Sequence, residues 1–94
     1  MIPIFEMIEK EKIEMLKFPR EDVLTDPSLI NERNSELNRA LSLGNLEYTK
    51  IKIYFEDDQS LKSVETTVWG VTDKRVILKQ GIVIPINRVH KISL

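Results

Sequence analysis

The chain contains no cysteine, which excludes disulfides, thiolate zinc sites and a cysteine nucleophile. Histidine is scarce as well, because His90 is the only one among 94 residues. The three glycines, Gly44, Gly70 and Gly81, are too few and too scattered to form a glycine-rich phosphate loop. We therefore expect a protein that is not an enzyme and that holds no cofactor and no metal.

Long apolar segments are also missing. No stretch approaches the roughly 20 apolar residues that a membrane-spanning helix needs. The opening sequence MIPIFEMIEK has no positively charged start and too short an apolar run for a signal peptide. These patterns predict a cytoplasmic protein with no membrane span.

Charge is nearly balanced overall but unevenly distributed. The formal net charge is −1, whereas residues 1–47 hold ten acids and six bases and residues 48–94 hold five acids and eight bases. Local fields steer partners more than the total charge does. The basic half is therefore the place to look for an anionic partner, unless the acidic half simply packs against it.

The first segment, 4–17, places Ile4, Ile8 and Met15 near one stripe of a helix, and we predict an amphipathic helix there. A strand over 12–18, where apolar and charged residues alternate, is the competing interpretation. The N-terminal apolar residues (Ile2, Ile4, Phe5 and Ile8) would cover the rest of the protein or a second copy, so we keep self-association through the N-terminal segment as a hypothesis.

A second helix is predicted after Pro19. Asp26 suits the N-cap, and Pro27 fits the first helical position, where its missing N–H costs nothing. Gly44 is a natural residue to end the helix. The apolar face of this helix consists of Ile30, Leu37 and Leu41.

From Lys50 the apolar period changes to two, which indicates strands. Five are predicted, near residues 50–55, 61–72, 75–79, 82–86 and 90–94. Gly70 inside the long second strand indicates a bulge or bend. The turns are too short for helical crossovers, so the sheet should be antiparallel and closed into a small barrel. The predicted core is Ile51, Ile53, Phe55, Val76, Leu78, Ile82, Ile84, Ile86, Val89 and Ile92.

The order of these parts resembles the Sm-like (SH3-like) barrels. The segments that carry the resemblance are KIKIYFED, DKRVILK and IVIPINRVHKI, the last being an apolar strand, a one-turn connection and a final short strand. Within that group the chain most resembles the small bacterial Rho-inhibitor (Rof-like) proteins. The resemblance implies an α+β fold, with N-terminal helices over 1–44 and a five-stranded barrel over 45–94 forming one cooperative domain. It also implies a regulatory module that binds a protein of the transcription or RNA machinery.

The chain departs from the Sm pattern where RNA-binding rings carry their base-contacting turns. Those turns would fall near 73–75 and 87–88, and the residues that stack and read bases are not there. Ring subunits also join by strand pairing, and Pro85 has no N–H to donate to such a ladder. The usual Sm ring is therefore not expected.

Two clusters of basic residues remain as candidate partner- or RNA-binding sites. Lys74 and Arg75 lie at one turn and Arg88 and Lys91 near another, and Trp69 could offer a stacking face. Direct RNA binding through these residues is the alternative to a protein partner. A second alternative is a PH-like module that docks on protein or membrane, which would require about seven strands and a C-terminal helix.

Overall fold

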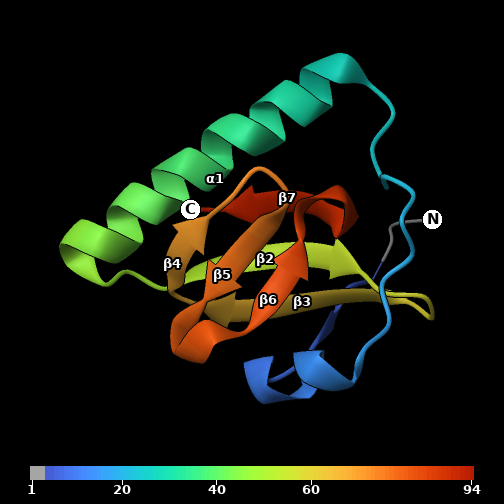
Figure 1. The fold of residues 1–94 in the computed structure, drawn as a ribbon, viewed down its shortest axis with the longest axis horizontal. Coiled ribbons are helices and arrows are strands. Elements are labelled where there is room, and N and C mark those ends of the chain that lie inside the picture. Colours follow the sequence, from blue (N-terminus) through green and yellow to red (C-terminus); the bar gives the residue numbers. More distant parts are fainter. Residues whose placement is uncertain (1–3) are drawn as a thin grey trace.

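The computed structural model describes residues 4–94, which form an α+β fold (Figure 1). The segment predicted as an N-terminal helix is instead the two-residue strand β1 (Glu6–Met7) followed by the 3-10 helix η1 (Lys10–Met15). The predictions of a helix over 4–17 and of a strand over 12–18 are therefore wrong. β1 runs parallel to β3 at a sheet edge, which keeps these residues extended. In η1 only Ile13 is buried, so the segment has no continuous helical stripe to pack.

The α-helix α1 (Pro27–Glu47) begins as the sequence predicts. The Asp26 side chain accepts a hydrogen bond of 2.9 Å from the Ser28 N–H, and Pro27 occupies the first turn. The helix does not end at Gly44 but continues to Glu47, where Tyr48 adopts a left-handed conformation at φ 53°. Gly44 is needed for packing instead, because a Cβ at this position would lie 2.2 Å from the carbonyl oxygen of Val68.

Two sheets form the body of the protein. Strands β2 (Ile51–Glu56), β3 (Leu61–Thr66) and β7 (Val89–Ser93) build the first sheet with β1, in the order β1-β3-β2-β7. The second sheet has the order β4-β5-β6 and consists of β4 (Val68–Val71), β5 (Arg75–Leu78) and β6 (Val83–Pro85). Two 3-10 turns, η2 (Lys79–Gly81) and η3 (Ile86–Arg88), join the last three strands.

The strand predictions hold in position but not in number. The single long strand predicted over 61–72 is two strands, because the chain passes from the first sheet to the second at Thr67. The predicted bulge at Gly70 is present as a register shift between Val68 and Gly70. Every pairing among β2–β7 is antiparallel, as predicted. Within residues 4–94 no strand pairing joins the edges of the two sheets, so the closed barrel stays a prediction.

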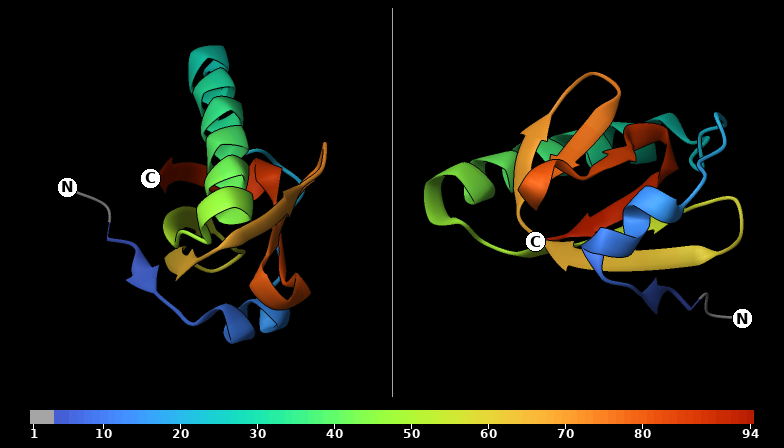
Figure 2. Two further views of the ribbon diagram at one scale, coloured as in Figure 1. Left: turned by 90° about the vertical axis from the view of Figure 1, so that its left-hand side faces the viewer. Right: turned by 60° about the horizontal axis from the view of Figure 1, so that its bottom comes forward.

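The second sheet lies in front of the first in Figure 1, and turning the molecule shows the two sheets side by side with α1 against them (Figure 2). The core lies between these layers. All ten residues of the predicted core are buried, and they are joined by others that include Ile13, Leu37, Val64 and Val68. The described residues contain seven strands, the number that a PH-like domain would need, but α1 lies before β2–β7 rather than after them.

Candidate functional site

The β4–β5 hairpin carries two of the predicted site residues at its tip. The Thr72 hydroxyl accepts hydrogen bonds from the Lys74 N–H (3.2 Å) and the Arg75 N–H (2.9 Å), which fixes the turn. The Lys74 carbonyl accepts a hydrogen bond from the Ile86 N–H at 2.9 Å, so the turn is tied to η3. Both basic side chains are exposed. The hairpin therefore holds its backbone rigidly while leaving two cations free to contact a partner.

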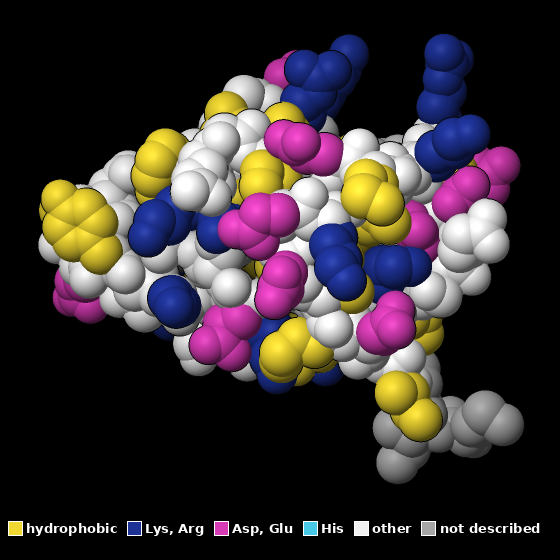
Figure 3. All heavy atoms as spheres, turned by 90° about the horizontal axis from the view of Figure 1, so that it is seen from below, with side chains coloured by type: hydrophobic (Ala, Val, Ile, Leu, Met, Phe, Trp, Pro, Cys, Tyr) yellow, Lys and Arg dark blue, Asp and Glu magenta, His cyan; other side chains and the backbone are white. Residues whose placement is uncertain are grey.

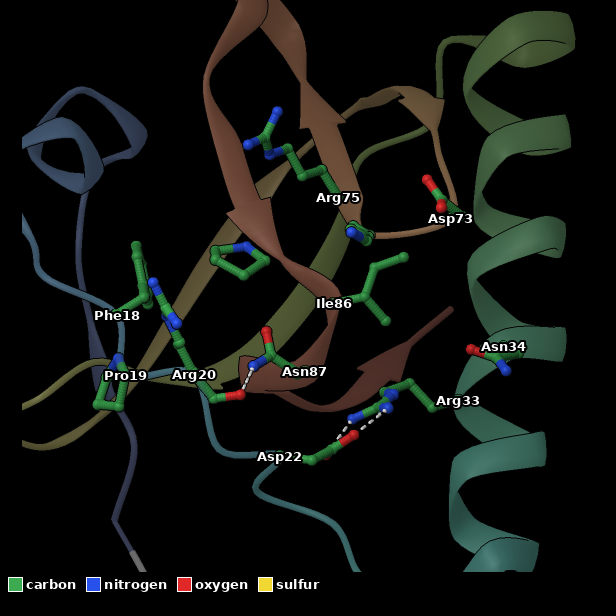
Figure 4. A pocket seen from close by; sticks show the side chains of 12 residues that line it. Phe18, Pro19, Arg20, Asp22, Arg33, Asn34, Asp73, Arg75, Ile86 and Asn87 are labelled. Atoms are coloured by element: carbon green, nitrogen blue, oxygen red, sulfur yellow. Dashed lines mark hydrogen bonds and ion pairs between the residues drawn. The ribbon is translucent and has the colours of Figure 1, made fainter.

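An open cleft of about 810 Å³ lies beside this hairpin, between η3, α1 and the segment that precedes α1 (Figure 4). Arg20 and Phe18 line one wall, and Asp73, Lys74 and Arg75 line the other. Within residues 4–94, the side chains of Arg20, Lys74 and Arg75 form no ion pair. Three unpaired cations against the single unpaired acid Asp73 make the cleft electropositive, which favours an anionic group.

The wall of the cleft that carries Arg20 is anchored by an ion pair. Arg33 of α1 is 4% exposed, and its two terminal nitrogens donate to the Asp22 carboxylate at 2.9 and 2.8 Å. The hydrogen bond from Arg33 lowers the pKa of Asp22 below its usual range, outweighing the opposing effect of partial burial. The Asn87 side chain donates to the Arg20 carbonyl, and the Val23 N–H donates to the Asn87 carbonyl at 2.9 Å. These contacts fix the irregular segment that carries Arg20.

Arg88, one of the predicted site residues, has a structural role instead. Its side chain is 8% exposed and donates to the carbonyls of Glu56 (3.0 Å), Glu21 (2.8 Å) and Asp57 (3.3 Å). All the directed hydrogen bonds of its guanidinium group thus go to the protein's own backbone. Arg88 joins the β2–β3 turn to the segment before α1, and its side chain is buried rather than presented at the surface.

Lys91 is exposed but lies elsewhere. It belongs to β7 in the first sheet, where its Nζ lies 4.9 Å from the centre of the Tyr54 ring. The structure therefore separates Lys91 from Lys74 and Arg75, which belong to the second sheet. Trp69 lies on β4 of that second sheet and is 51% exposed. Lys74, Arg75 and Trp69 thus share one hairpin.

In the acidic turn between β2 and β3, the Asp57 carboxylate is bound by other groups of the protein. Asp57 is 2% exposed, and its carboxylate accepts hydrogen bonds from the Lys62 ammonium at 2.8 Å and the Ser60 N–H at 2.9 Å. Although burial opposes ionisation, these bonds lower the pKa of Asp57. Within residues 4–94, the His, Asp and Glu side chains form no group of three that could hold a metal ion.

Other surfaces carry less information. Seen from below, the protein mixes Lys and Arg with Asp and Glu, while two groups of basic side chains project from the upper edge of the view (Figure 3). A smaller pocket of about 370 Å³ lies between α1 and β7 and is lined by Glu32, Glu36, Phe5 and His90, among others. Burial and then the neighbouring Glu32 raise the pKa of Glu36.

The N-terminal apolar residues divide between packing and exposure. Phe5 packs edge-on against Tyr54 with ring centres 5.0 Å apart, and Ile8 packs against the core, whereas Ile4 is 86% exposed. Ile2, which belongs to the same predicted set, lies outside the described residues. Self-association through this segment stays a prediction.

Sequence reasoning missed Arg20 and Phe18, because the sequence FPRED gives no signal beyond a break at Pro19. No helix among residues 4–94 combines the length and apolarity needed to cross a bilayer. Searches against protein-family models, curated proteins and solved structures find no match to this chain.

Proposed function

We propose that this chain is a non-enzymatic binding module that docks an acidic segment of a protein partner, a component of the transcription or RNA machinery, in the cleft beside the β4–β5 hairpin. The observation that carries the proposal is the set of three unpaired cations, Arg20, Lys74 and Arg75, around one cleft of about 810 Å³. The type of partner comes from the resemblance to Rof-like proteins and to the Sm-like barrel. A cytoplasmic location is part of the same proposal.

The polypeptide around the cleft supports a docking role rather than catalysis. Its charged side chains are either exposed and unpaired, like Lys74, or fixed in a structural ion pair, like Arg33 with Asp22. Exposed cations around a cleft raise the rate at which an oppositely charged partner associates, and the effect weakens as salt screens the charges. Affinity for the partner should therefore fall as the ionic strength rises.

Affinity capture from a nuclease-treated cell extract tests this proposal. The double variant Lys74→Glu/Arg75→Glu should lose partners that the wild-type protein retains. Lys50→Glu/Lys91→Glu is the matched control, because it changes the net charge equally at exposed positions away from the cleft. Identical captures with all three proteins, or captures that nuclease removes entirely, would argue against a protein partner in the cleft.

Direct binding of single-stranded RNA is the second candidate, and the exposure of Trp69 on the same hairpin favours it. An exposed aromatic ring near cations is the combination that single-strand binders use. Trp69 is the only tryptophan, so quenching of intrinsic fluorescence by an oligonucleotide reports on this residue alone. Each lost phosphate contact should reduce the slope of log affinity against log salt by about 0.7. Unchanged fluorescence at low salt would eliminate this candidate.

A PH-like docking module is the least supported alternative, because α1 precedes β2–β7 instead of following them, although the number of strands agrees. This alternative would be supported if the wild-type protein bound vesicles that contain anionic lipids and the Lys74→Glu/Arg75→Glu variant did not.

A further inference from the structure

The outer edge of β6 offers backbone groups that no other part of the described chain uses. The Leu78 N–H donates to the Ile82 carbonyl and the Ile86 N–H donates to the Lys74 carbonyl, and Val76 pairs with Ile84 between them. In an antiparallel pair the residues between such positions point their backbone groups away from the partner strand. Val83 therefore directs an N–H and a C=O outward, and Pro85 directs a C=O outward.

This geometry explains why the sheet tolerates a proline at position 85. It pairs with Arg75 at a position where no N–H to β5 is required, so its missing donor costs the sheet nothing. Within residues 4–94, no hydrogen bond outside the sheets involves Val83 or Pro85. The free groups of the edge are therefore one donor, the Val83 N–H, and two acceptors, the carbonyls of Val83 and Pro85.

An apolar groove of about 310 Å³ lies along this edge, between β6 and η1. Leu16, Phe18, Val83 and Pro85 line it, and Val83 is 39% exposed. Phe18, Arg75 and Pro85 line both this groove and the basic cleft, so the two are continuous. One path over the surface therefore runs from apolar side chains beside a free sheet edge to unpaired cations.

A second copy of the chain is not the occupant that this edge fits. Pairing between copies in the Sm manner would place β7 of one protomer against β6 of the next. The Val89 carbonyl of β7 already accepts a 3.0 Å hydrogen bond from Arg33 of α1, and α1 packs against β7. Helix α1 thus covers the strand that a second copy would have to supply.

We infer that the β6 edge adds a strand from the partner protein: an extended segment whose apolar side chains lie in the groove and whose acidic residues reach the cleft. This inference rests on the function proposed above and specifies the partner's chemistry. Strand addition takes its affinity from main-chain hydrogen bonds and its selectivity from pockets for alternate side chains. RNA has no peptide N–H and C=O groups that could pair with Val83 as a strand does, so the free edge favours a polypeptide.

The test uses the full chain and two blocked nine-residue peptides, which carry alternating valine and threonine at one end and four glutamates at the other, in the two possible orders. Nitrogen-15 NMR should show the Val83 amide shifting on titration and exchanging with solvent at least tenfold more slowly. The same peptide with alternate backbone amides methylated should bind at least tenfold more weakly, because methylation removes the donors and leaves the protein unchanged.

Variants separate the edge from the cleft. Val83→Pro removes the free N–H and should weaken peptide binding at least tenfold, whereas Val83→Ala keeps that N–H and should weaken it less. If methylation and Val83→Pro have no effect while Lys74→Glu/Arg75→Glu abolishes binding, strand addition is overturned and the proposed acidic docking stands. Absence of binding at millimolar peptide overturns strand addition. A dimer that Val83→Pro dissociates would overturn it in favour of a second copy.

Discussion

The contact between Gly44 and β4 gives the most direct test of the fold. An added Cβ would lie 2.2 Å from the Val68 carbonyl oxygen and 3.2 Å from the Thr67 Cγ2 atom. The first atom belongs to the backbone, so it cannot rotate away as the end of a side chain would. Either α1 or β4 must move by more than an ångström to admit even a methyl group.

Two effects of Gly44→Ala oppose each other. Replacing glycine by alanine inside a helix ordinarily stabilises a protein by up to about 1 kcal/mol. Forcing a methyl group into a close-packed contact typically costs about 1–3 kcal/mol, and more when backbone must shift. We expect the steric cost to win, with a net loss of about 2 kcal/mol in the free energy of unfolding. For a domain of this size that corresponds to a fall in Tm of roughly 8–16 °C.

Urea unfolding followed by circular dichroism measures this difference. Asn45→Ala is the matched control, because Asn45 is the next residue of the helix and is exposed. It should gain stability by a few tenths of a kcal/mol from helix propensity alone. If Gly44→Ala is as stable as wild type or more so, α1 does not approach β4 as closely as the structure shows, and the argument fails.

Three further outcomes concern individual charged side chains. Arg88→Met should lower the free energy of unfolding by about 3 kcal/mol, since it leaves three backbone carbonyls without their donor, whereas Lys91→Met should change it by less than about 1 kcal/mol; urea titration compares them. The pKa of Asp22 is lowered in the folded state, so the ionised carboxylate stabilises the fold above its unfolded pKa, and this stabilisation is lost as the pH falls through the folded pKa. Asp22→Asn should therefore reduce stability at pH 7 and flatten the dependence of stability on pH below about 4. Parallel curves for the two proteins in a melting series from pH 2 to 7 would contradict this reasoning. The pKa of Glu36 is raised in the folded state, so its ionised form destabilises the fold. Glu36→Gln should therefore raise Tm at pH 7, and the gain should disappear as the pH falls below about 4. A lower Tm for the variant at pH 7 would show that the fold needs the carboxylate.

The strands were the most predictable part of this protein. Alternation of apolar and polar residues is a local property, and each strand buries one face, as β2 does at Ile51, Ile53 and Phe55. The N-terminal segment was not predictable by the same method. Its inward-facing apolar residues are Ile8, Ile13, Leu16 and Phe18, at spacings that belong to neither a helix nor a strand, while the apolar residues Ile4 and Met15 are exposed. Contacts with β3 and β6, distant in sequence, decide its path.

The candidate site was predictable only in part, because a basic residue in the sequence does not show what surrounds it. Lys74 and Arg75 lie at a tight turn, as predicted, and both are exposed. Arg88 comes from an equally basic stretch, yet three carbonyls from two other segments converge on its guanidinium group. Only the tertiary path of the segment before α1 places the Glu21 carbonyl there, and the same path brings Arg20 to the cleft. The charges were visible in the sequence, and their neighbours were not.

Pro85 is the residue whose meaning changes most once its neighbours are known. From the sequence it counts against a ring, because it cannot donate to a ladder. In the sheet, Pro85 lies at a position whose backbone groups point away from β5, so the β6 edge lacks one N–H donor there but keeps the carbonyl of Pro85 and both groups of Val83. Arg33 closes the corresponding edge of β7 by binding the Val89 carbonyl. The β6 edge has few free hydrogen-bonding groups but is open, whereas the β7 edge is covered. This combination suits the addition of a single strand and opposes repeated pairing between copies.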